Sequence, residues 1–346
     1  MGDALGAPVE FMRRSAILAR FGSKGITRYV PAYGGLGSIT DDTQMTLFTA
    51  EGLLRARVRH AAKGISHIPS VVAHAYLRWL RTQSESPAKR IGEIGDGWLF
   101  QHSLLHNRRA PGNTCLSALK AMESFGDPAR NDSKGCGGVM RMAPVGLMGW
   151  SEGWSAQEVF RTGNALSALT HAHPSGIYPS GVLAVLILAL IDGASLQEGL
   201  ATAKALLKTE TRHEETLRAI ETAESLAAST LPPHEAIARL GQGWVAEEAL
   251  AIAVYCALVA RTFRQGVVLA VNHDGDSDST GSIAGNLLGA MHGVKAIPEA
   301  WLEPLELREV IAETAHDLYD ARAWDLGEYS KNRECNEHLL QKYPGW

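Results

Sequence analysis

Three aspartates at alternate positions form the part of this sequence best suited to chemistry. Asp274, Asp276 and Asp278 are followed directly by two residues with hydroxyl side chains. Like charges at this spacing repel one another, and a carboxylate removed from water needs a compensating partner. The stretch from Val267 to Gly293 contains no lysine or arginine. A hard divalent cation bound through oxygen would supply the missing positive charge.

A second pair of aspartates lies near the start of the chain. Thr40, Asp41 and Asp42 follow a glycine-rich segment, 34–37, and precede an apolar pattern that predicts a helix as far as Arg59. Threonine or aspartate at this place can simply cap the helix, because a side-chain oxygen there accepts a backbone N–H. One carboxylate would suffice for a cap, so two of them beside a hydroxyl favour metal ligation.

The two acidic clusters have the same composition, and we expect the fold to bring them together. Each combines a hydroxyl with paired carboxylates at a helix start, and each offers too few oxygens to hold an ion alone. Together they supply enough hard oxygens for one or two divalent ions. Two ions about 3.5–4 Å apart would orient a water or a substrate hydroxyl between them. The candidate ligands are Thr40, Asp41, Asp42, Asp276, Asp278 and Ser279.

Three further charged residues have two interpretations each. Glu10 belongs to a capped helix start, or it lies near the acidic clusters. Arg141 contacts a phosphate, or it forms a buried structural ion pair. Asp274 has no role in the site, or it supports the metal ligands without binding the ion itself.

Turns elsewhere in the chain supply weaker candidates for substrate contact. The segment 135–140 is dense in glycine, which can expose backbone N–H groups to phosphate oxygens, but it matches neither a dinucleotide fingerprint nor a Walker A loop. Asn113 is a candidate that a cap of the helix 115–125 would explain as well. His171 lies on an irregular turn. Trp244, on a glycine-flanked turn, could stack on a base, although core packing is the commoner use of tryptophan.

The composition excludes several classes of protein. With 346 residues, 45% hydrophobic and 20% charged, and a net charge of -4, the chain is an ordinary globular protein without the basic field that nucleic acid requires. Its four cysteines form no CxxC pair, which fits reduced thiols better than disulfides or zinc. The first residues, Met-Gly-Asp-Ala-Leu-Gly, lack the basic and apolar regions of a signal peptide. The longest apolar run, 182–191, is about half of the ~20 residues that span a bilayer. We expect a cytoplasmic monomer without a nucleic-acid or membrane partner.

Helical periodicity dominates the chain, and it predicts an all-α fold in one domain over residues 1–346. No period-2 alternation bounded by hairpin turns and no internal repeat interrupts it. The predicted helices are 40–59, 69–80, 91–105 with glycine breaks, 115–125, 156–170, 175–191, 195–208, 213–229, 233–240, 246–262, 280–293 and 306–324.

Glycine recurs at every fourth residue behind the second acidic cluster, at Gly281, Gly285, Gly289 and Gly293. Each glycine inside a helix costs about 0.8–1 kcal/mol relative to alanine. Very close packing against another helix would compensate that cost. We therefore expect this helix to be central and to hold its acidic first turn rigidly.

Taken together, the motifs resemble the ADP-ribosylglycohydrolase family, which includes the dinitrogenase reductase-activating glycohydrolases and the ADP-ribosylarginine hydrolases. The matching segments occur in the family's order between Gly2 and Gly293. They are Gly-Asp-Ala-Leu-Gly, Thr-Asp-Asp-Thr-Gln-Met, Gly-Gly-Val-Met-Arg-Met-Ala-Pro, the His171 turn and Gly-Asp-Ser-Asp-Ser-Thr-Gly. The resemblance implies a compact all-α bundle with two Mg²⁺ or Mn²⁺ ions in a central cleft, held by the six candidate ligands.

The resemblance also implies which residues meet the substrate. In the family the glycine segment lies along the diphosphate and ribose, the histidine that matches His171 lines the cleft, and the aromatic place of Trp244 is near the substrate. Glu10 falls where some members carry a glutamate close to the metal. The substrate-binding candidates are Asn113, Gly135, Gly137, Gly138, Met140, His171 and Trp244.

The implied activity is removal of ADP-ribose from a modified protein, most closely the N-glycosidic bond to arginine, with ADP-ribose as product. Asp42 or Asp278, or else Glu10, would be the catalytic base. The alternatives are a hydrolase of another linkage, to serine or in a small ADP-ribose conjugate, and a non-catalytic binding or structural member. The complete set of carboxylates favours an enzyme. Members usually have a helix before Gly-Asp-Ala-Leu-Gly, and this sequence begins inside that motif. Either the start is truncated or the helix is absent, and a missing helix would loosen the wall behind Glu10.

Overall fold

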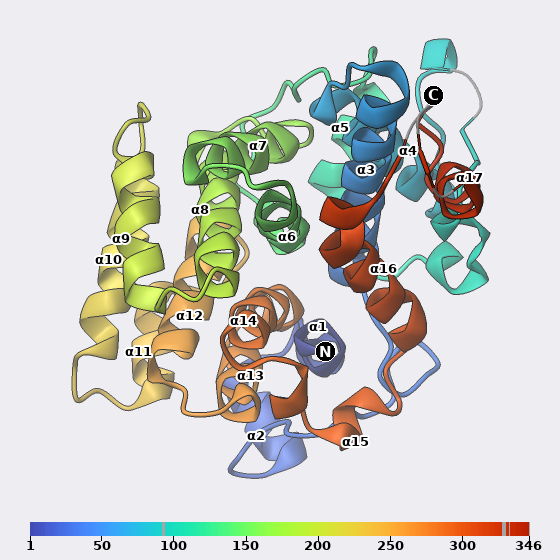
Figure 1. Cartoon of the computed structure of the whole chain (residues 1–346). Coiled ribbons are helices and arrows are strands. Elements are labelled where there is room, and N and C mark those ends of the chain that lie inside the picture. The colour runs from blue at the N-terminus through green and yellow to red at the C-terminus, as the bar shows by residue number, and fades with distance from the viewer. Residues whose placement is uncertain (92–93, 327–329, 332, 346) are drawn as a thin grey trace.

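The computed structural model confirms the all-α fold; it describes residues 1–91, 94–326, 330–331 and 333–345 (Figure 1). In these residues β structure is limited to two isolated bridges, Ala32–Gly35 and Gly135–Val245. The helices of the first half are α1 (Gly2–Gly6), α2 (Arg14–Phe21), α3 (Asp41–Lys63), α4 (Ile68–Thr82), α5 (Asn113–Ala121), α6 (Ala143–Glu152), α7 (Ala156–Ala168) and α8 (Pro174–Ile191). Those of the second half are α9 (Leu196–Leu207), α10 (Glu214–Ala227), α11 (Pro233–Leu240), α12 (Ala246–Val259), α13 (Phe263–Val271), α14 (Ser277–His292), α15 (Glu299–Leu302), α16 (Arg308–Asp320) and α17 (Arg333–Lys342).

Helix starts with strong local signals lie close to where the sequence predicts them. Ser155 with Glu158, and Ser195 with Glu198, form capping boxes at the starts of α7 and α9. In each box the serine accepts the glutamate's backbone N–H while the glutamate side chain accepts the serine N–H, so two exposed donors are satisfied at once. The predicted ends are less accurate, because helices fray there.

The predicted helix over 91–105 is wrong. Apart from residues 92–93, which lie outside the described residues, this segment contains only short 3₁₀ turns at Leu99–Gln101 and Ser103–His106. Gly97 has φ of 105°, and a methyl group there would lie 1.9 Å from the guanidinium of Arg55. A buried ion pair therefore takes the space that a helix side chain would need.

Several helices are missing from the predicted set, and α13 is the most informative. Thr262 caps it by accepting the backbone N–H of Gln265 at 3.1 Å, and Phe263, Val267 and Val271 are buried along it. The cap and this spacing indicate a helix in retrospect. The short helices α2, α15 and α17 are also absent from the prediction.

Helix α14 is central, as the sequence predicts. It packs against α1, α8, α12 and α13, and Figure 1 shows α1 and α14 side by side below α6. In Figure 1, helices α3, α4 and α16 lie to the right of α14, on the side of the molecule away from α9 and α10. Of the described helices only α8 is long and apolar enough to cross a membrane, but most of it is buried against other helices of the fold.

The predicted close packing of the glycine row is confirmed for its first half only. A methyl group at Gly281 would lie 2.7 Å from the carbonyl oxygen of Gly2, and Gly285 also faces Gly2. A methyl group at Gly289 would have no heavy atom within 4 Å apart from the neighbouring backbone of its own helix. Gly293, which follows the helix, has φ of 72°. The glycines thus let α1 approach the acidic end of α14, whereas the far end is open.

Two alanine substitutions in α14 should have opposite effects on stability. Gly281→Ala should destabilise the fold by about 1–3 kcal/mol, because the new methyl group overlaps Val271 and Gly2. Gly289→Ala is the matched control, and it should stabilise the helix by up to about 1 kcal/mol. Urea unfolding of both variants measures the difference. Equal effects would contradict the glycine-mediated contact.

Candidate functional site

Both acidic clusters lie at the first turn of a helix, and each helix is capped by a cluster residue. Thr40 caps α3 by accepting the backbone N–H of Asp42 at 3.4 Å. Asp276 caps α14 by accepting the backbone N–H of Ser279 at 3.3 Å. The capping interpretation is therefore correct for both turns, and it does not compete with a ligand role. The N-terminal ends of helices also favour negative charge.

The fold brings the two clusters into direct contact. The hydroxyl of Ser279 donates to Asp42 Oδ2 at 3.3 Å, although these residues are 237 positions apart. Carboxylate oxygens of Glu10, Asp276 and Asp278 all lie within 4.8 Å of one another. Glu10 therefore belongs to the acidic site, and it lies at the end of the 3₁₀ turn Ala7–Val9 and not at a helix start.

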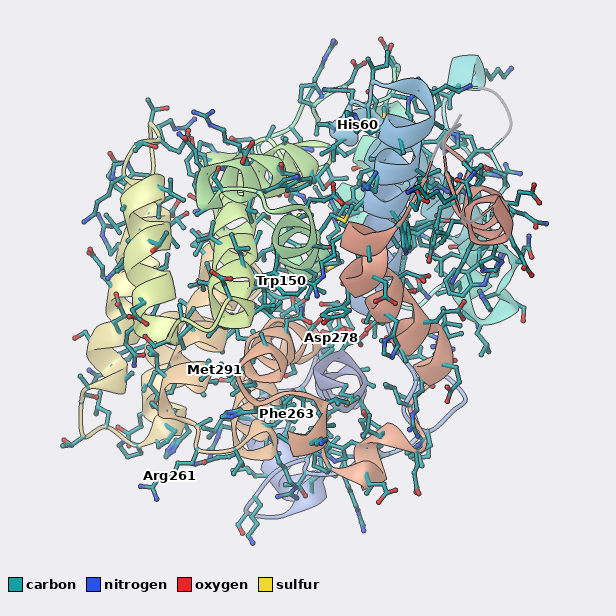
Figure 2. All side chains as sticks on the ribbon, viewed as in Figure 1. His60, Trp150, Arg261, Phe263, Asp278 and Met291 are labelled. Carbon is teal, nitrogen blue, oxygen red and sulfur yellow. The ribbon has the colours of Figure 1, made fainter. Side chains whose placement is uncertain are left out.

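These residues line a cleft of about 470 Å³, a volume within the range of small-molecule sites. Asp278 lies near the centre of the molecule in Figure 2. The cleft lining contains these predicted ligand and substrate residues: Glu10, Asp41, Asp42, Asn113, Gly135, Gly137, Met140, His171, Trp244, Asp276, Asp278 and Ser279.

Two predicted site residues are not part of the cleft lining. One is Thr40, whose hydroxyl is 3.4 Å from Asp42 Oδ2. Gly138 packs away from the cleft, because a methyl group there would lie 2.2 Å from the Ser167 hydroxyl oxygen. Asn113 lines the cleft as the first residue of α5; Gly112 occupies the cap position, so the interpretation of Asn113 as the cap is wrong.

The carboxylates of the cleft have no basic partner. Among the ion pairs of the described residues, none includes Glu10, Asp41, Asp42, Asp276 or Asp278. Burial raises the pKa of Glu10 to about 9, with further contributions from neighbouring carboxylates. Burial likewise raises the pKa of Asp41 to about 8. The pKa values of Asp42 and Asp278 rise well above the ordinary range through burial and then through repulsion by neighbouring carboxylates.

The donor set fits a hard divalent cation. Asp42 Oδ1 and Glu10 Oε2 are buried and have no hydrogen-bond partner. An unpartnered carboxylate oxygen is costly to bury, and a cation would satisfy it. Carboxylate and hydroxyl oxygens without an imidazole suit Mg²⁺ or Mn²⁺ better than Zn²⁺.

Asp3 supports the site, a role that the sequence does not reveal. Its carboxylate accepts hydrogen bonds from the backbone N–H and the hydroxyl of both Thr40 and Thr43. It is 1% exposed and belongs to α1. Asp3 therefore ties α1 to the first turn of α3, while the glycines tie it to α14. Asp274, in contrast, is exposed and accepts the backbone N–H of Arg14 outside the cleft.

Cys136 is a second residue whose role the sequence does not reveal. Its thiol donates to Asp276 Oδ2 at 2.9 Å from the glycine-rich loop. That loop pairs with the Trp244 turn, because Cys136 N–H donates to the Trp244 carbonyl and Ala246 N–H to the Lys134 carbonyl. Lys134 also forms an ion pair with Glu247 at 2.9 Å. The thiol of Cys136, the backbone bonds to the Trp244 turn and the ion pair of Lys134 thus hold the loop next to the acidic site.

An aromatic pair forms one edge of the cleft. The rings of Phe11 and Trp244 stack with centroids 5.7 Å apart. Phe11 is 72% exposed and Trp244 is 39% exposed, so the ring of Trp244 is not a core residue. Phe11 follows Glu10 directly, which places an apolar surface beside the carboxylates.

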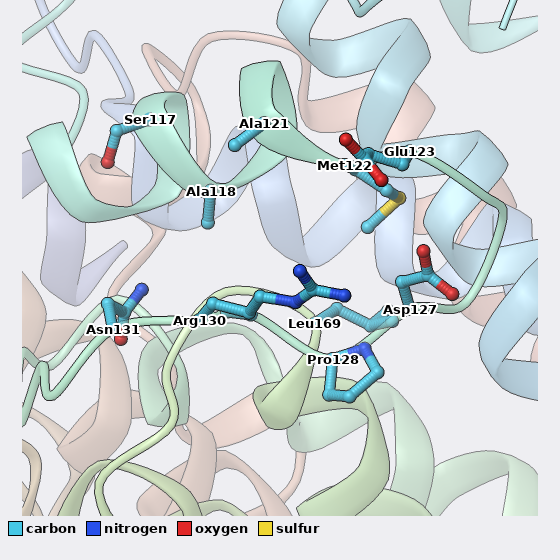
Figure 3. A pocket seen from close by; sticks show the side chains of 11 residues that line it. Ser117, Ala118, Ala121, Met122, Glu123, Asp127, Pro128, Arg130, Asn131 and Leu169 are labelled. Atoms are coloured by element: carbon cyan, nitrogen blue, oxygen red, sulfur yellow. The ribbon is translucent and has the colours of Figure 1, made fainter.

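A separate cavity of about 380 Å³ lies between α5 and the segment 127–131 (Figure 3). Its charged lining residues, Glu123, Asp127 and Arg130, carry mixed signs. None of the predicted site residues lines it. The acidic cleft is therefore the better candidate for chemistry.

A family model described as ADP-ribosylglycohydrolase matches residues 1–326. The chain belongs to the ADP-ribosylglycohydrolase family. A solved structure titled "ADP-ribosylglycohydrolase-related protein complex" is 27% identical, with a TM-score of 0.66, and the match covers 93% of this chain and 94% of that one. The resemblance stated from the motifs is therefore correct.

Two curated relatives are hydrolases of this family. The ADP-ribosyl-(dinitrogen reductase) glycohydrolase of Rhodospirillum rubrum is 25% identical over 89% of this chain and 87% of its own. The ADP-ribosylarginine hydrolase Tri1 of Serratia proteamaculans (strain 568) is 24% identical over 92% of this chain and 76% of its own. The family and these relatives support ADP-ribosyl hydrolase activity for the chain.

The buried carboxylates predict that the cation-free protein loses stability as the pH rises. Glu10 and Asp41 keep their protons in the folded state up to about pH 9 and 8, against ordinary pKa values of 4.5 and 3.8. The folded state therefore binds more protons in this window, so its stability is full below about pH 4 and falls as the pH approaches 9. Added Mg²⁺ should restore more stability at the alkaline end, because it replaces the protons.

Thermal unfolding between about pH 5 and pH 9, in chelator and in Mg²⁺, measures this linkage. Asp42→Asn should flatten the pH dependence, whereas Asp274→Asn, an exposed carboxylate outside the cleft, should preserve it. A melting temperature in chelator that does not fall with pH would contradict the assignment of the raised pKa values.

Proposed function

We propose that this protein is a metal-dependent hydrolase that removes ADP-ribose from arginine side chains of modified proteins. The observation that carries the proposal is the joined site: two capped helix starts bring four carboxylates together with Glu10 in one cleft, and no described basic residue forms an ion pair with them. The arginine linkage is supported by the relative named ADP-ribosylarginine hydrolase and by the Asp-Ser-Asp-Ser sequence of the second cluster, which resembles the arginine-type hydrolases more than members with Asp-x-Asp-Thr. We also propose a binuclear Mg²⁺ or Mn²⁺ site.

Thr40, Asp41, Asp42, Asp276, Asp278 and Ser279 would hold the two cations. When bound, these ions supply positive charge that neutralises the carboxylates and draws the ribose hydroxyls and a water into the cleft. Asp41 is oriented by the loop before α5, because Gly112 N–H donates to its Oδ2 at 3.2 Å. Asp276 is oriented by the thiol of Cys136 and by its cap interaction.

The reaction is displacement by water at the anomeric carbon. A bond forms from the water oxygen to that carbon, and the bond to the arginine nitrogen breaks. The proton lost by the water passes by way of the accepting carboxylate to the departing guanidine. The transition state resembles an oxocarbenium ion, whose positive charge the carboxylates stabilise. Asp42, Asp278 or Glu10 accepts the proton of the water. The unpartnered oxygens of Asp42 and Glu10 are free to do so, whereas Asp278 Oδ1 already accepts the Ser279 N–H at 3.0 Å.

The cleft also holds residues for the rest of the ADP-ribosyl group. The glycine loop at Gly135 and Gly137 allows a phosphate chain to approach the backbone closely, and the Trp244 and Phe11 rings offer a surface for stacking. We further propose a cytoplasmic monomer without nucleic-acid or membrane partners. Three cysteines, Cys115, Cys136 and Cys256, are free thiols, which fits a reducing compartment; the side chain of Cys335 lies outside the described residues.

Release of ADP-ribose from ADP-ribosylated arginine in Mg²⁺ tests the proposal. Asp278→Asn should lower the rate by about 10²–10⁴-fold, because it removes a carboxylate from the acidic site. Asp274→Asn is the matched control and should hydrolyse at the wild-type rate. Equal rates for wild type and Asp278→Asn would overturn the proposed site. Faster release from a serine-linked substrate would overturn the arginine linkage but not the hydrolase.

A further inference from the structure

His171 lies at the floor of the cleft beside the glycine loop. The side chain is 1% exposed, and a methyl group built on Gly135 would lie 3.3 Å from its Nε2. Its Nδ1 points the other way, toward the interior, where it is 2.9 Å from the hydroxyl oxygen of Thr170. The two ring nitrogens therefore face different surroundings. Which nitrogen carries the proton decides whether the cleft presents a donor or an acceptor.

Arg141 determines the direction of the hydrogen bond between Thr170 and His171. A guanidinium N–H of Arg141 donates to Thr170 Oγ1 at 2.6 Å. Arginine has no acceptor, so Thr170 must accept this bond and still has one hydroxyl proton to place. Three acceptors lie within reach: the His171 nitrogen, at 2.9 Å, the Ser167 carbonyl oxygen, at 3.4 Å, and the sulfur of Cys115. A thiol sulfur is a weak acceptor, so it does not compete with the imidazole nitrogen.

The Ser167 carbonyl is the poorer acceptor. It already receives the backbone N–H groups of Thr170 and His171, each at 3.0 Å. Its distance from the hydroxyl also lies beyond the usual range for an O–H donor. The Thr170 proton therefore goes to His171 Nδ1, and the imidazole proton must be on Nε2, facing the cleft.

Arg141, at one end of this chain of hydrogen bonds, carries a positive charge that it does not lose. Arg141 is fully buried, and no ion pair among the described residues includes it. Its guanidinium lies 4.2 Å from the centre of the Tyr76 ring and 3.2 Å from the sulfur of Met45. Arg141 is not part of the cleft lining and pairs with no described carboxylate, so the structure supports neither a phosphate contact nor a buried ion pair.

The same surroundings keep the imidazole neutral. Burial, followed by the positive charge of Arg141, lowers the pKa of His171 to about 3. Cys115, a buried thiol 3.5 Å from the Arg141 guanidinium, is the other titratable neighbour, and burial raises its pKa, so it too stays neutral. Among the described residues, Arg141 is the one charged group that acts on the ring.

We infer that Arg141 and Thr170 are positioning residues that hold His171 as a neutral Nε2–H donor, so that the cleft floor selects an acceptor oxygen of the ligand. The identity of that ligand rests on the proposed function: the oxygen belongs to the diphosphate or the terminal ribose of the ADP-ribosyl group. The tautomer itself depends only on the fold and holds without any ligand.

The test begins with the tautomer, read from nitrogen NMR of the full chain labelled at histidine, with His171→Ala used to assign the signal. The wild type should show Nε2–H and an unprotonated Nδ1 between about pH 5 and pH 8. Thr170→Val removes the hydroxyl with little change in shape and should abolish this preference. Thr170→Ser, which keeps the hydroxyl, should restore it. An Nδ1–H tautomer or a charged ring in the wild type overturns the inference.

Binding of ADP-ribose and ADP then tests the ligand contact. Thr170→Val should weaken the binding of ADP-ribose by roughly five- to tenfold, which is the effect of losing one hydrogen bond. An equal loss with ADP assigns the contact to the diphosphate, and a loss with ADP-ribose alone assigns it to the terminal ribose. Thr314→Val deletes another buried hydroxyl, bonded only within α16, and controls for the cost of that deletion.

Two results separate this inference from the proposed function. If Thr170→Val changes the tautomer but binds both ligands as tightly as the wild type, the selection of an acceptor oxygen is overturned. If the wild type binds neither ligand, the proposed function fails, and the tautomer measurement still decides whether Arg141 and Thr170 act as described.

Discussion

The burial of several carboxylates beside one another is the constraint on which the rest of this site depends. Five acidic side chains from three segments of the chain share one cleft, and none forms an ion pair with a described residue. Burial raises the pKa of each of them, which means that the folded protein disfavours their charged forms. The cost is offset only if protons or cations accompany the carboxylates, so the cleft is built to bind positive charge.

The surrounding structure holds these groups in place. Helix α1 contacts α14 through glycines and binds the start of α3 through Asp3, so one short helix aligns the two acidic turns. The glycine loop and the Trp244 turn close another side through paired backbone bonds. Charged pairs such as Lys134 with Glu247 stand outside the cleft and support it without neutralising it. A rigid frame of this kind keeps ligand oxygens at fixed distances.

The sequence predicts correctly that the two acidic turns meet, because the signal at each turn is local. Paired aspartates beside hydroxyls at two helix starts, without nearby basic residues, indicate a shared cation site before any fold is known. The contributions of Asp3 and Cys136 could not be predicted in this way, since each depends on a contact between distant segments. Periodicity also misjudged Gly289, because spacing shows which residues share a face but not what packs against that face.

The central claim is that the clusters of α3 and α14 bind cations together. Crystals grown with Mn²⁺ would test it most directly through anomalous scattering. The account predicts two peaks between Asp41 and Asp276, within ligand distance of both clusters, and loss of the peaks in Asp278→Asn. Peaks confined to one cluster, or no peaks at saturating Mn²⁺, would contradict it.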